Sequence, residues 1–253
     1  MRRMSPRLAF AVEVAVKAGR STLPHFQTGT AVELKSDATP VTIADREAER
    51  LIRSELKARY PKEAVLGEEE GQVGAGSSRW VLDPIDGTKS FISGVPLYAT
   101  LLAFEEGGDP ILGVCYFPAL NELLYAETGR GATWNGRPAR VSETPSLEGS
   151  VVVSGSMASM TKAGRSEGFR RIEAKTMASR TWSDAYGHAL VATGRVAAMV
   201  DPIVARWDIS AMAVIVREAG GRFTDFKGGD GLVGEALSSN GLVHHELLEA
   251  FRR

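Results

Sequence analysis

The chain has 253 residues, of which 43% are apolar and 24% charged, a composition that predicts a globular protein with a large buried core. Thirty basic residues stand against 31 acidic ones, a balance that argues against a nucleic-acid or membrane-surface binder. The single cysteine, Cys115, excludes an internal disulfide and a multi-cysteine metal site, and a cytoplasmic protein is expected because no signal peptide or membrane span is recognisable.

Two helices are predicted in the first sixty residues. Ser5 and Pro6 are typical of a helix start, and apolar residues at helical spacing follow them. A second helix, with its apolar residues along one stripe, is predicted for residues 43–59. Thr42 and Asp45 at its start form a helix-capping pattern, so a structural role for this pair has to be weighed against any other.

Short runs of β-forming residues follow and predict an antiparallel meander at residues 80–82, 98–104, 111–117 and 123–126. The glycine-rich residues 71–78 are expected to form a mobile loop. Beyond residue 145, strands alternate with helices, with strands at 151–154 and 197–200 and helices at 185–192, 209–219 and after 241. The sequence therefore predicts an N-terminal α+β half, residues 1–140, joined to a C-terminal α/β half, residues 141–253.

The segment WVLDPIDGT, residues 80–88, carries the strongest chemical signal. Asp83 and Asp86 follow an apolar strand directly, where carboxylates are costly unless something neutralises them. Two carboxylates and the backbone carbonyl of Ile85 are oxygen ligands of the kind that hard divalent cations prefer. Gly87 lets the backbone approach a ligand, and the amides after it could hold a phosphate oxygen. A simple turn is the alternative for this segment, because Asp, Pro and Gly are common turn residues.

Three motifs in order resemble those of the inositol monophosphatase superfamily: Gly67-Glu68-Glu69, the segment from Trp80 to Phe91, and Trp207-Asp208. The resemblance covers essentially the whole chain. It implies a layered αβαβα sandwich of the sugar-phosphatase type and Mg²⁺-dependent hydrolysis of a small phosphate monoester. Because members of the family are commonly homodimers, a homodimer is also expected.

The resemblance assigns ligands for two Mg²⁺ ions. Glu68, Asp83 and the carbonyl of Ile85 would hold one ion, while Asp83, Asp86 and Asp208 would hold the second, with Asp83 bridging them. A third, weakly held ion near Glu68 is also seen in the family. One ion would lower the pKa of the attacking water and another would offset charge on the leaving oxygen. Taken alone, Glu68 would read as part of a solvated acidic loop and Asp208 as a helix cap.

The resemblance also implies two catalytic assistants. Asp45 would accept a hydrogen bond from Thr88, and Thr88 together with Glu68 would help to deprotonate the attacking water. A bare helix cap is the alternative for Asp45. Lys35 matches a lysine on the flexible metal-site loop of the family, with a solvated surface lysine as its alternative. The histidines form no catalytic set, and His244 is expected at the surface.

Residues 180–187, RTWSDAYG, resemble a block of the histidinol-phosphate phosphatases within this superfamily. Asp184 in this block and Asp201, seven residues before Asp208, suit the ammonium and imidazole of L-histidinol phosphate better than a neutral polyol. A helix cap and a strand end are the plain alternatives for these two aspartates. The substrate contacts that the resemblance implies are Asp86, Gly87, Thr88, Lys89, Arg180, Asp184 and Asp201.

The resemblance therefore implies a histidinol-phosphatase that acts in histidine biosynthesis. An inositol-1-monophosphatase or a sugar-phosphate phosphatase is the first alternative, because the superfamily motifs alone do not choose among phosphate esters. A catalytically silent, metal-stabilised binding protein on the same scaffold is a further alternative, because a fold does not imply a function.

Overall fold

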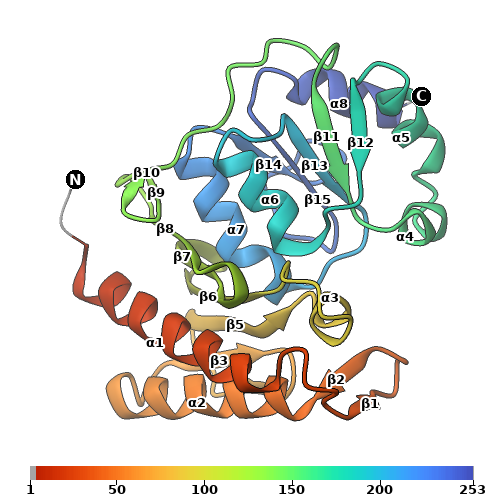
Figure 1. Ribbon diagram of the computed structural model, residues 1–253. Coiled ribbons are helices and arrows are strands. Elements are labelled where there is room, and N and C mark those ends of the chain that lie inside the picture. The colour runs from red at the N-terminus through yellow and green to blue at the C-terminus, as the bar shows by residue number, and fades with distance from the viewer. Residues whose placement is uncertain (1–3, 253) are drawn as a thin grey trace.

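The computed structural model describes residues 4–252 and arranges them in layers that alternate helix and sheet (Figure 1). Helices α1 (Pro6–Thr22) and α2 (Ile43–Arg59) pack on one face of the larger sheet. Helices α6 (Asp184–Ala192) and α7 (Arg206–Glu218) lie between the two sheets. The far face of the smaller sheet is covered by α4 (Met157–Lys162), α5 (Ser166–Glu173) and α8 (His244–Arg252). The predicted αβαβα sandwich is confirmed.

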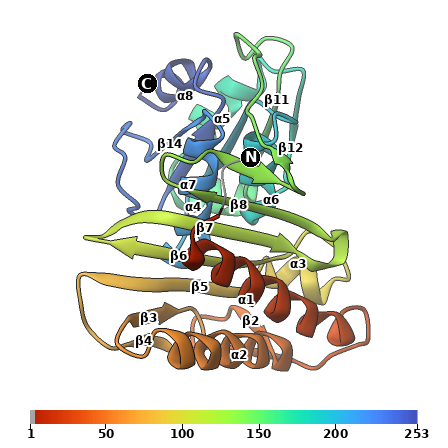
Figure 2. The same ribbon diagram turned by 90° about the vertical axis from the view of Figure 1, so that its left-hand side faces the viewer.

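Within residues 4–252, the larger sheet has eight strands in the order β10-β9-β8-β7-β6-β5-β3-β4, and Figure 2 shows β5 to β8 lying in succession. Strands β5 to β8 are antiparallel neighbours, which confirms the predicted meander. Strand β3 runs parallel to β5. The bounds are β3 (Ala64–Gly67), β4 (Gly71–Val73), β5 (Ser78–Asp86), β6 (Ala99–Glu106), β7 (Asp109–Phe117), β8 (Glu122–Glu127), β9 (Ala132–Trp134) and β10 (Arg137–Pro138).

Three short elements surround this sheet. A hairpin of β1 (Val32–Leu34) and β2 (Pro40–Thr42) precedes α2, and α3 (Thr88–Ile92) follows β5 directly. Single 3-10 turns lie at Leu23–His25 and Pro118–Leu120. No helix in the described part of the chain combines the length and the apolar character needed to cross a membrane.

Both faces of β5 are covered, which explains why its sequence is apolar at consecutive positions. Trp80 and Leu82 pack with α1 and α2, whereas Val81 packs on the side of α6 and α7. Because side chains alternate along a strand, Asp83 follows Val81 to the α7 side. The end of β5 therefore presents an aspartate to the boundary between the two sheets.

The smaller sheet has the strand order β12-β11-β13-β15-β14. Strand β11 is parallel to both β12 and β13, and β15 is antiparallel to its two neighbours. The boundary predicted at residue 140 falls in the segment between β10 and β11, but the division into two domains stays a prediction. The bounds are β11 (Val151–Ser154), β12 (Ala178–Arg180), β13 (Ala198–Asp201), β14 (Arg222–Thr224) and β15 (Ala236–Ser239).

Three local predictions were wrong. Gly71–Val73 is not a loop, because its backbone pairs with β3 at the edge of the larger sheet. Helix α7 begins at Arg206 instead of residue 209, since the Asp208 carboxylate accepts the Ala205 N–H at 2.7 Å from within the first turn. His244 is buried, because both of its ring nitrogens meet buried hydroxyl groups.

Candidate active site

A cavity of about 300 Å³ lies where the end of β5 meets the first turns of α6 and α7. Its wall combines residues from both halves of the chain. Among the lining residues that the structure describes, Lys89 is the one lysine or arginine, and its side chain is exposed. The cavity is therefore strongly acidic and favours cations. Its six acidic lining residues are Glu68, Asp83, Asp86, Asp184, Asp201 and Asp208.

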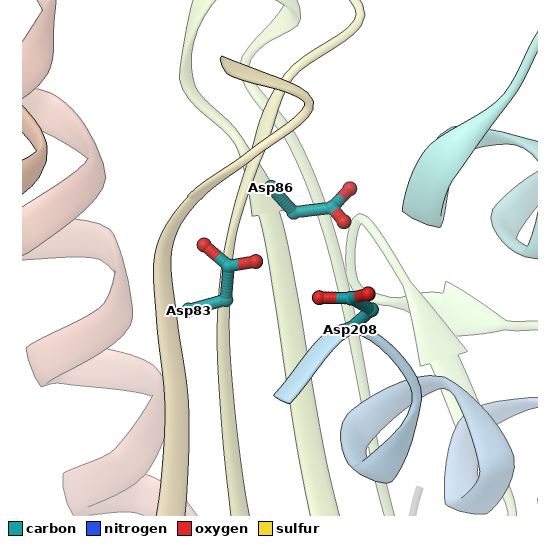
Figure 3. A group of neighbouring side chains, drawn as sticks. All are labelled: Asp83, Asp86 and Asp208. Carbon is teal, nitrogen blue, oxygen red and sulfur yellow. The ribbon is translucent and has the colours of Figure 1, made fainter. Parts of the chain in front are cut away.

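Asp83, Asp86 and Asp208 point toward one another in this cavity (Figure 3). Each offers one carboxylate oxygen, and these oxygens lie within 4.8 Å of one another. Asp83 and Asp86 are three positions apart, so regular alternation would send them to opposite faces of β5. A bulge between them in the pairing with β6 removes this conflict. Backbone amides then fix both carboxylates: the Ile85 N–H donates to Asp83 at 3.0 Å and the Ala185 N–H to Asp86 at 2.7 Å.

Asp83 and Asp86 are buried, Asp208 is partly buried, and the three carboxylates repel one another. Burial, and then repulsion from Glu68, Asp86 and Asp208, raises the pKa of Asp83 well above its ordinary value. Burial and repulsion from Asp184 and Asp208 do the same to the pKa of Asp86. Burial also raises the pKa of Asp208 to about 7. A divalent cation that prefers oxygen ligands would relieve the repulsion and replace the lost hydration, so this donor set fits such an ion.

The metal-free protein should lose stability as the pH rises from about 4 to about 7. In this range Asp208 keeps its proton in the folded protein, with a pKa of about 7, but is ionised in the unfolded chain, where its pKa is the ordinary 3.8. The stabilisation that this proton gives is lost as the pH passes through the folded pKa. A divalent cation that binds this cluster must displace such protons, so its stabilising effect should grow over the same range.

Thermal unfolding with and without Mg²⁺ checks this expectation. The rise in Tm on adding Mg²⁺ should be larger at about pH 8 than at about pH 5.5, since fewer protons compete with the ion at the higher pH. An equal rise at both pH values would contradict the raised pKa values of the three aspartates.

Glu68 lies on the turn between β3 and β4 and lines the cavity, but it falls outside the tight group of three aspartates. Lys35, in the loop between β1 and β2, places its Nζ 2.7 Å from an oxygen of Glu68 and 2.7 Å from an oxygen of Glu69. This ammonium group offsets negative charge at the mouth of the acidic cavity. The structure thus brings Glu68 and Lys35 to the site, and the role of Glu68 as a metal ligand stays a prediction.

Asp45 caps α2 and faces Thr88 at the same time. One of its oxygens accepts the Thr42 N–H at 2.8 Å and the Thr42 hydroxyl at 2.6 Å, which completes the predicted cap. The other oxygen lies 3.4 Å from the Thr88 hydroxyl, which is also 3.1 Å from the carbonyl of Ile85. The hydroxyl has one proton and can fully serve only one of these acceptors. The catalytic roles of Asp45 and Thr88, and metal binding by the Ile85 carbonyl, stay predictions.

Gly87 and Asp184 come close together although one follows β5 and the other begins α6. Both have left-handed backbone conformations, with φ of 82° at Gly87 and 58° at Asp184. A Cβ on residue 87 would lie 3.1 Å from an Asp184 oxygen, so glycine lets the aspartate approach the turn. A left-handed aspartate is uncommon and costs backbone energy, which marks this contact as one that the surrounding structure enforces.

Of the other predicted substrate contacts, the structure brings Asp201 and Lys89 to the cavity but leaves Arg180 outside it. Burial, and then repulsion from Asp184 and Asp208, raises the pKa of Asp201 well above its ordinary value. Arg180 is exposed, and its guanidinium donates to the carbonyl of the preceding residue at 2.7 Å. The geometry of the single chain therefore gives no support to a substrate contact by Arg180.

Two groups near the cavity were not predicted from the sequence. Gly155 and Ser156 follow β11 and line the cavity, and a Cβ on Gly155 would approach an Asp201 oxygen to 2.9 Å. Their signal was their place after a predicted strand, since ligands of α/β sheets bind at the carboxyl ends of strands. Glu49, on α2, accepts hydrogen bonds from the turn that carries Glu68. The sequence feature that could have identified Glu49 is its position, as a carboxylate, on the buried face of an amphipathic helix.

The chain is similar to known proteins over nearly its whole length. The chain matches the model of the Inositol monophosphatase family over residues 3–253. It is 42% identical over 251 residues to a histidinol-phosphatase of Chlorobaculum parvum, covering 98% of the chain and 97% of that protein. It is 40% identical to a fructose-1,6-bisphosphatase/inositol-1-monophosphatase of Thermotoga maritima, covering 96% and 94%. The solved structure of an IMPase from Thermotoga maritima superposes with a TM-score of 0.90 at 38% identity, covering 98% and 97%.

Proposed function

Because the chain belongs to the inositol monophosphatase family and is a phosphoric monoester hydrolase, we propose that it hydrolyses L-histidinol phosphate to L-histidinol and phosphate with the help of Mg²⁺. This activity would be a step of histidine biosynthesis. We further propose that the enzyme is a cytoplasmic homodimer whose subunits each consist of an N-terminal α+β domain, residues 1–140, and a C-terminal α/β domain, residues 141–253.

The observation that carries this proposal is a pair of carboxylates in the cavity, the half-buried Asp184 and the buried Asp201, beside the three clustered aspartates. Burial raises the pKa of both residues, so each carboxylate gains from a cationic partner. L-histidinol phosphate supplies an ammonium and an imidazole, whereas a neutral polyol would leave the carboxylates unpaired. The 42% identity to a histidinol-phosphatase supports the same substrate.

The proposed metal ligands are Glu68, Asp83 and the Ile85 carbonyl for one ion, and Asp83, Asp86 and Asp208 for the second, with a third, weaker ion near Glu68. When bound, these ions would activate the attacking water and offset charge on the leaving oxygen. The raised pKa values of Asp83, Asp86 and Asp208 support this assignment, because a cation relieves the strain of ionising them together.

The side chains of the protein would move and hold the other groups. Asp45 would accept the hydrogen bond of the Thr88 hydroxyl, 3.4 Å away, and the oxygen of Thr88 would then be free to accept one from the attacking water. Thr88 and Glu68 together would then remove the proton of the water as its oxygen bonds to phosphorus and the ester P–O bond breaks. Backbone amides after Gly87 and the ammonium of Lys89 would hold the phosphate oxygens. The departing alcohol oxygen takes up a proton from solvent water, the proton removed from the attacking water returns to solvent, and no covalent enzyme intermediate is needed.

An inositol-1-monophosphatase or sugar-phosphate phosphatase is the second candidate. The 40% identity to a fructose-1,6-bisphosphatase/inositol-1-monophosphatase favours it, since the two relatives are almost equally similar to this chain. A catalytically silent binding protein is disfavoured, because the acidic cluster and Thr88 all line one cavity.

Asp184→Asn and Asp201→Asn test the choice of substrate. Each change should lower kcat/KM for L-histidinol phosphate by about ten- to a hundredfold, the loss of one charge-assisted hydrogen bond worth about 1.5–3 kcal/mol. Hydrolysis of inositol 1-phosphate should fall less, or rise, because no unpaired charge then remains in the pocket. Phosphate release measured on both substrates checks this.

Asp230→Asn is the matched control, since it removes an exposed carboxylate that does not line the cavity. It should leave both reactions unchanged. If the Asp184 and Asp201 variants lost kcat/KM equally on the charged and the neutral substrate, these residues would support the metal site or the fold instead of selecting the substrate.

A further inference from the structure

Glu49 is a carboxylate that the proposed chemistry does not use, yet it is completely buried on α2. One of its oxygens accepts the Glu69 N–H at 2.9 Å. The other accepts the Glu70 N–H at 3.0 Å and the Nε–H of Arg53 at 2.8 Å. All three donors therefore converge on one side chain, and two of them belong to the backbone of the turn between β3 and β4.

The residue that precedes this turn, Gly67, also packs against Glu49. Gly67 ends β3, and a Cβ there would overlap the Glu49 carboxylate and the guanidinium of Arg53. Arg53 also donates to the carbonyl of Gly71, where β4 begins. Glu49 and Arg53 thus contact the backbone both before and after Glu68. Glu68 is the one residue of the turn that lines the cavity.

Burying the ion pair of Glu49 and Arg53 costs desolvation free energy. Replacing such a pair by apolar residues of similar volume often leaves the stability of a protein unchanged or raises it. A carboxylate that receives two backbone N–H groups does, however, fix the orientation of a turn. Glu49 also lies one helical turn after Asp45, so the same face of α2 contacts Thr88 through Asp45 and the Glu68 turn through Glu49. One helix face therefore reaches both groups that are proposed to act on the attacking water.

We propose that Glu49 is a positioning residue of the active site: its carboxylate orients the turn so that Glu68 meets the metal cluster of Asp83, Asp86 and Asp208. This inference rests on the proposed metal-dependent phosphatase function. Glu49 touches neither the cavity nor the clustered aspartates, so it acts only through the backbone of the turn. Its loss should weaken metal binding more than it slows the reaction of the fully metal-loaded enzyme.

The test is Glu49→Gln in the full chain, with Mn²⁺ binding measured by electron paramagnetic resonance. Glutamine keeps the volume but turns an NH₂ group toward N–H donors, so the turn loses at least one of its anchors. Mn²⁺ binding should weaken by about ten- to a hundredfold, as is usual when a group that supports a metal ligand is removed. The Mg²⁺ concentration for half-maximal phosphate release should rise by the same factor, while kcat at saturating Mg²⁺ should fall by a smaller factor than Mn²⁺ affinity does.

Glu122→Gln is the matched control. Glu122 is also buried and pairs with an arginine, Arg195, at 2.5 Å, but it does not line the cavity. Loss of this pair should lower the Tm and leave Mn²⁺ affinity unchanged. Equal loss of Mn²⁺ affinity in both variants would overturn the inference, because it would then follow from lower stability alone.

A folded Glu49→Gln protein with wild-type Mn²⁺ affinity would also overturn the inference. If Glu49→Gln does not fold, Glu49→Asp decides, since it keeps the charge but is one methylene shorter and should bind Mn²⁺ more weakly than the wild type. Wild-type affinity in this variant would again overturn it. Failure of the proposed function is a separate result: the wild-type protein would bind Mn²⁺ but release no phosphate from any ester.

Discussion

Asp86→Asn should reduce phosphate release by more than about a hundredfold at any accessible Mg²⁺ concentration, since even residues that only support metal ligands cost ten- to a hundredfold when changed. Asparagine keeps the shape of the side chain and can still accept the Ala185 N–H, which donates to Asp86 at 2.7 Å. The change removes one negative charge from the cluster that is proposed to hold the second ion. Loss of activity would therefore reflect loss of the metal site, with the backbone around it intact.

Stability should respond to Asp86→Asn in the opposite direction. Burial and repulsion from Asp184 and Asp208 raise the pKa of Asp86 in the metal-free protein, so ionising this residue costs folding free energy at neutral pH. The metal-free variant should have a Tm equal to or above that of the metal-free wild type. Adding Mg²⁺ should raise the Tm of the variant less than it raises the Tm of the wild type. Thermal unfolding and phosphate release together check the prediction. Near-normal turnover of the variant at low Mg²⁺ would contradict the assignment of Asp86 as a metal ligand.

Thr88→Ala should lower kcat by about a hundredfold or more, the usual contribution of a side chain that helps to move a proton. Asp45→Asn should lower it by a similar factor. The structure favours asparagine over alanine at residue 45, because one oxygen must remain to accept the Thr42 N–H that caps α2. The amide group of asparagine can then face the Thr88 hydroxyl, where it no longer offers an acceptor.

The double variant Thr88→Ala/Asp45→Asn separates one catalytic unit from two independent residues. If Asp45 acts only by orienting the Thr88 hydroxyl, 3.4 Å away, its change has nothing left to disturb once that hydroxyl is gone. The kcat of the double variant should then equal that of the slower single variant. A loss equal to the product of the two single losses would mean that Asp45 and Thr88 act separately.

The groups that could be predicted from the sequence are those whose signal is local. Asp83, Asp86 and Gly87 stand within five residues at the end of an apolar strand, and the structure places all three at the cavity. The meander and the principal helices were also predictable, because the spacing of the hydrophobic residues in each element matches the face that it buries. Asp208 was found only through the resemblance to a family, since a lone aspartate near a helix start has an ordinary explanation as a cap.

The remaining features depend on contacts between distant segments. Glu49 could not be assigned, because its partners lie about 20 residues away on a turn that leads into β4, which was itself predicted to be part of a loop. The bulge that turns Asp83 and Asp86 to the same side arises from pairing with β6, which no spacing within β5 reveals. The close approach of Asp184, in its left-handed conformation, to Gly87 likewise joins two residues that lie far apart in the sequence.

The central claim is tested most directly by phosphate release from the wild-type protein, with and without Mg²⁺, on L-histidinol phosphate, inositol 1-phosphate and fructose 1,6-bisphosphate. The acidic cavity predicts that kcat/KM is highest for L-histidinol phosphate. Treatment with a chelator should abolish release from every substrate, and added Mg²⁺ should restore it. A higher kcat/KM for the inositol or sugar phosphate would contradict the assigned substrate, and release that persists after chelation would contradict the assigned metal site.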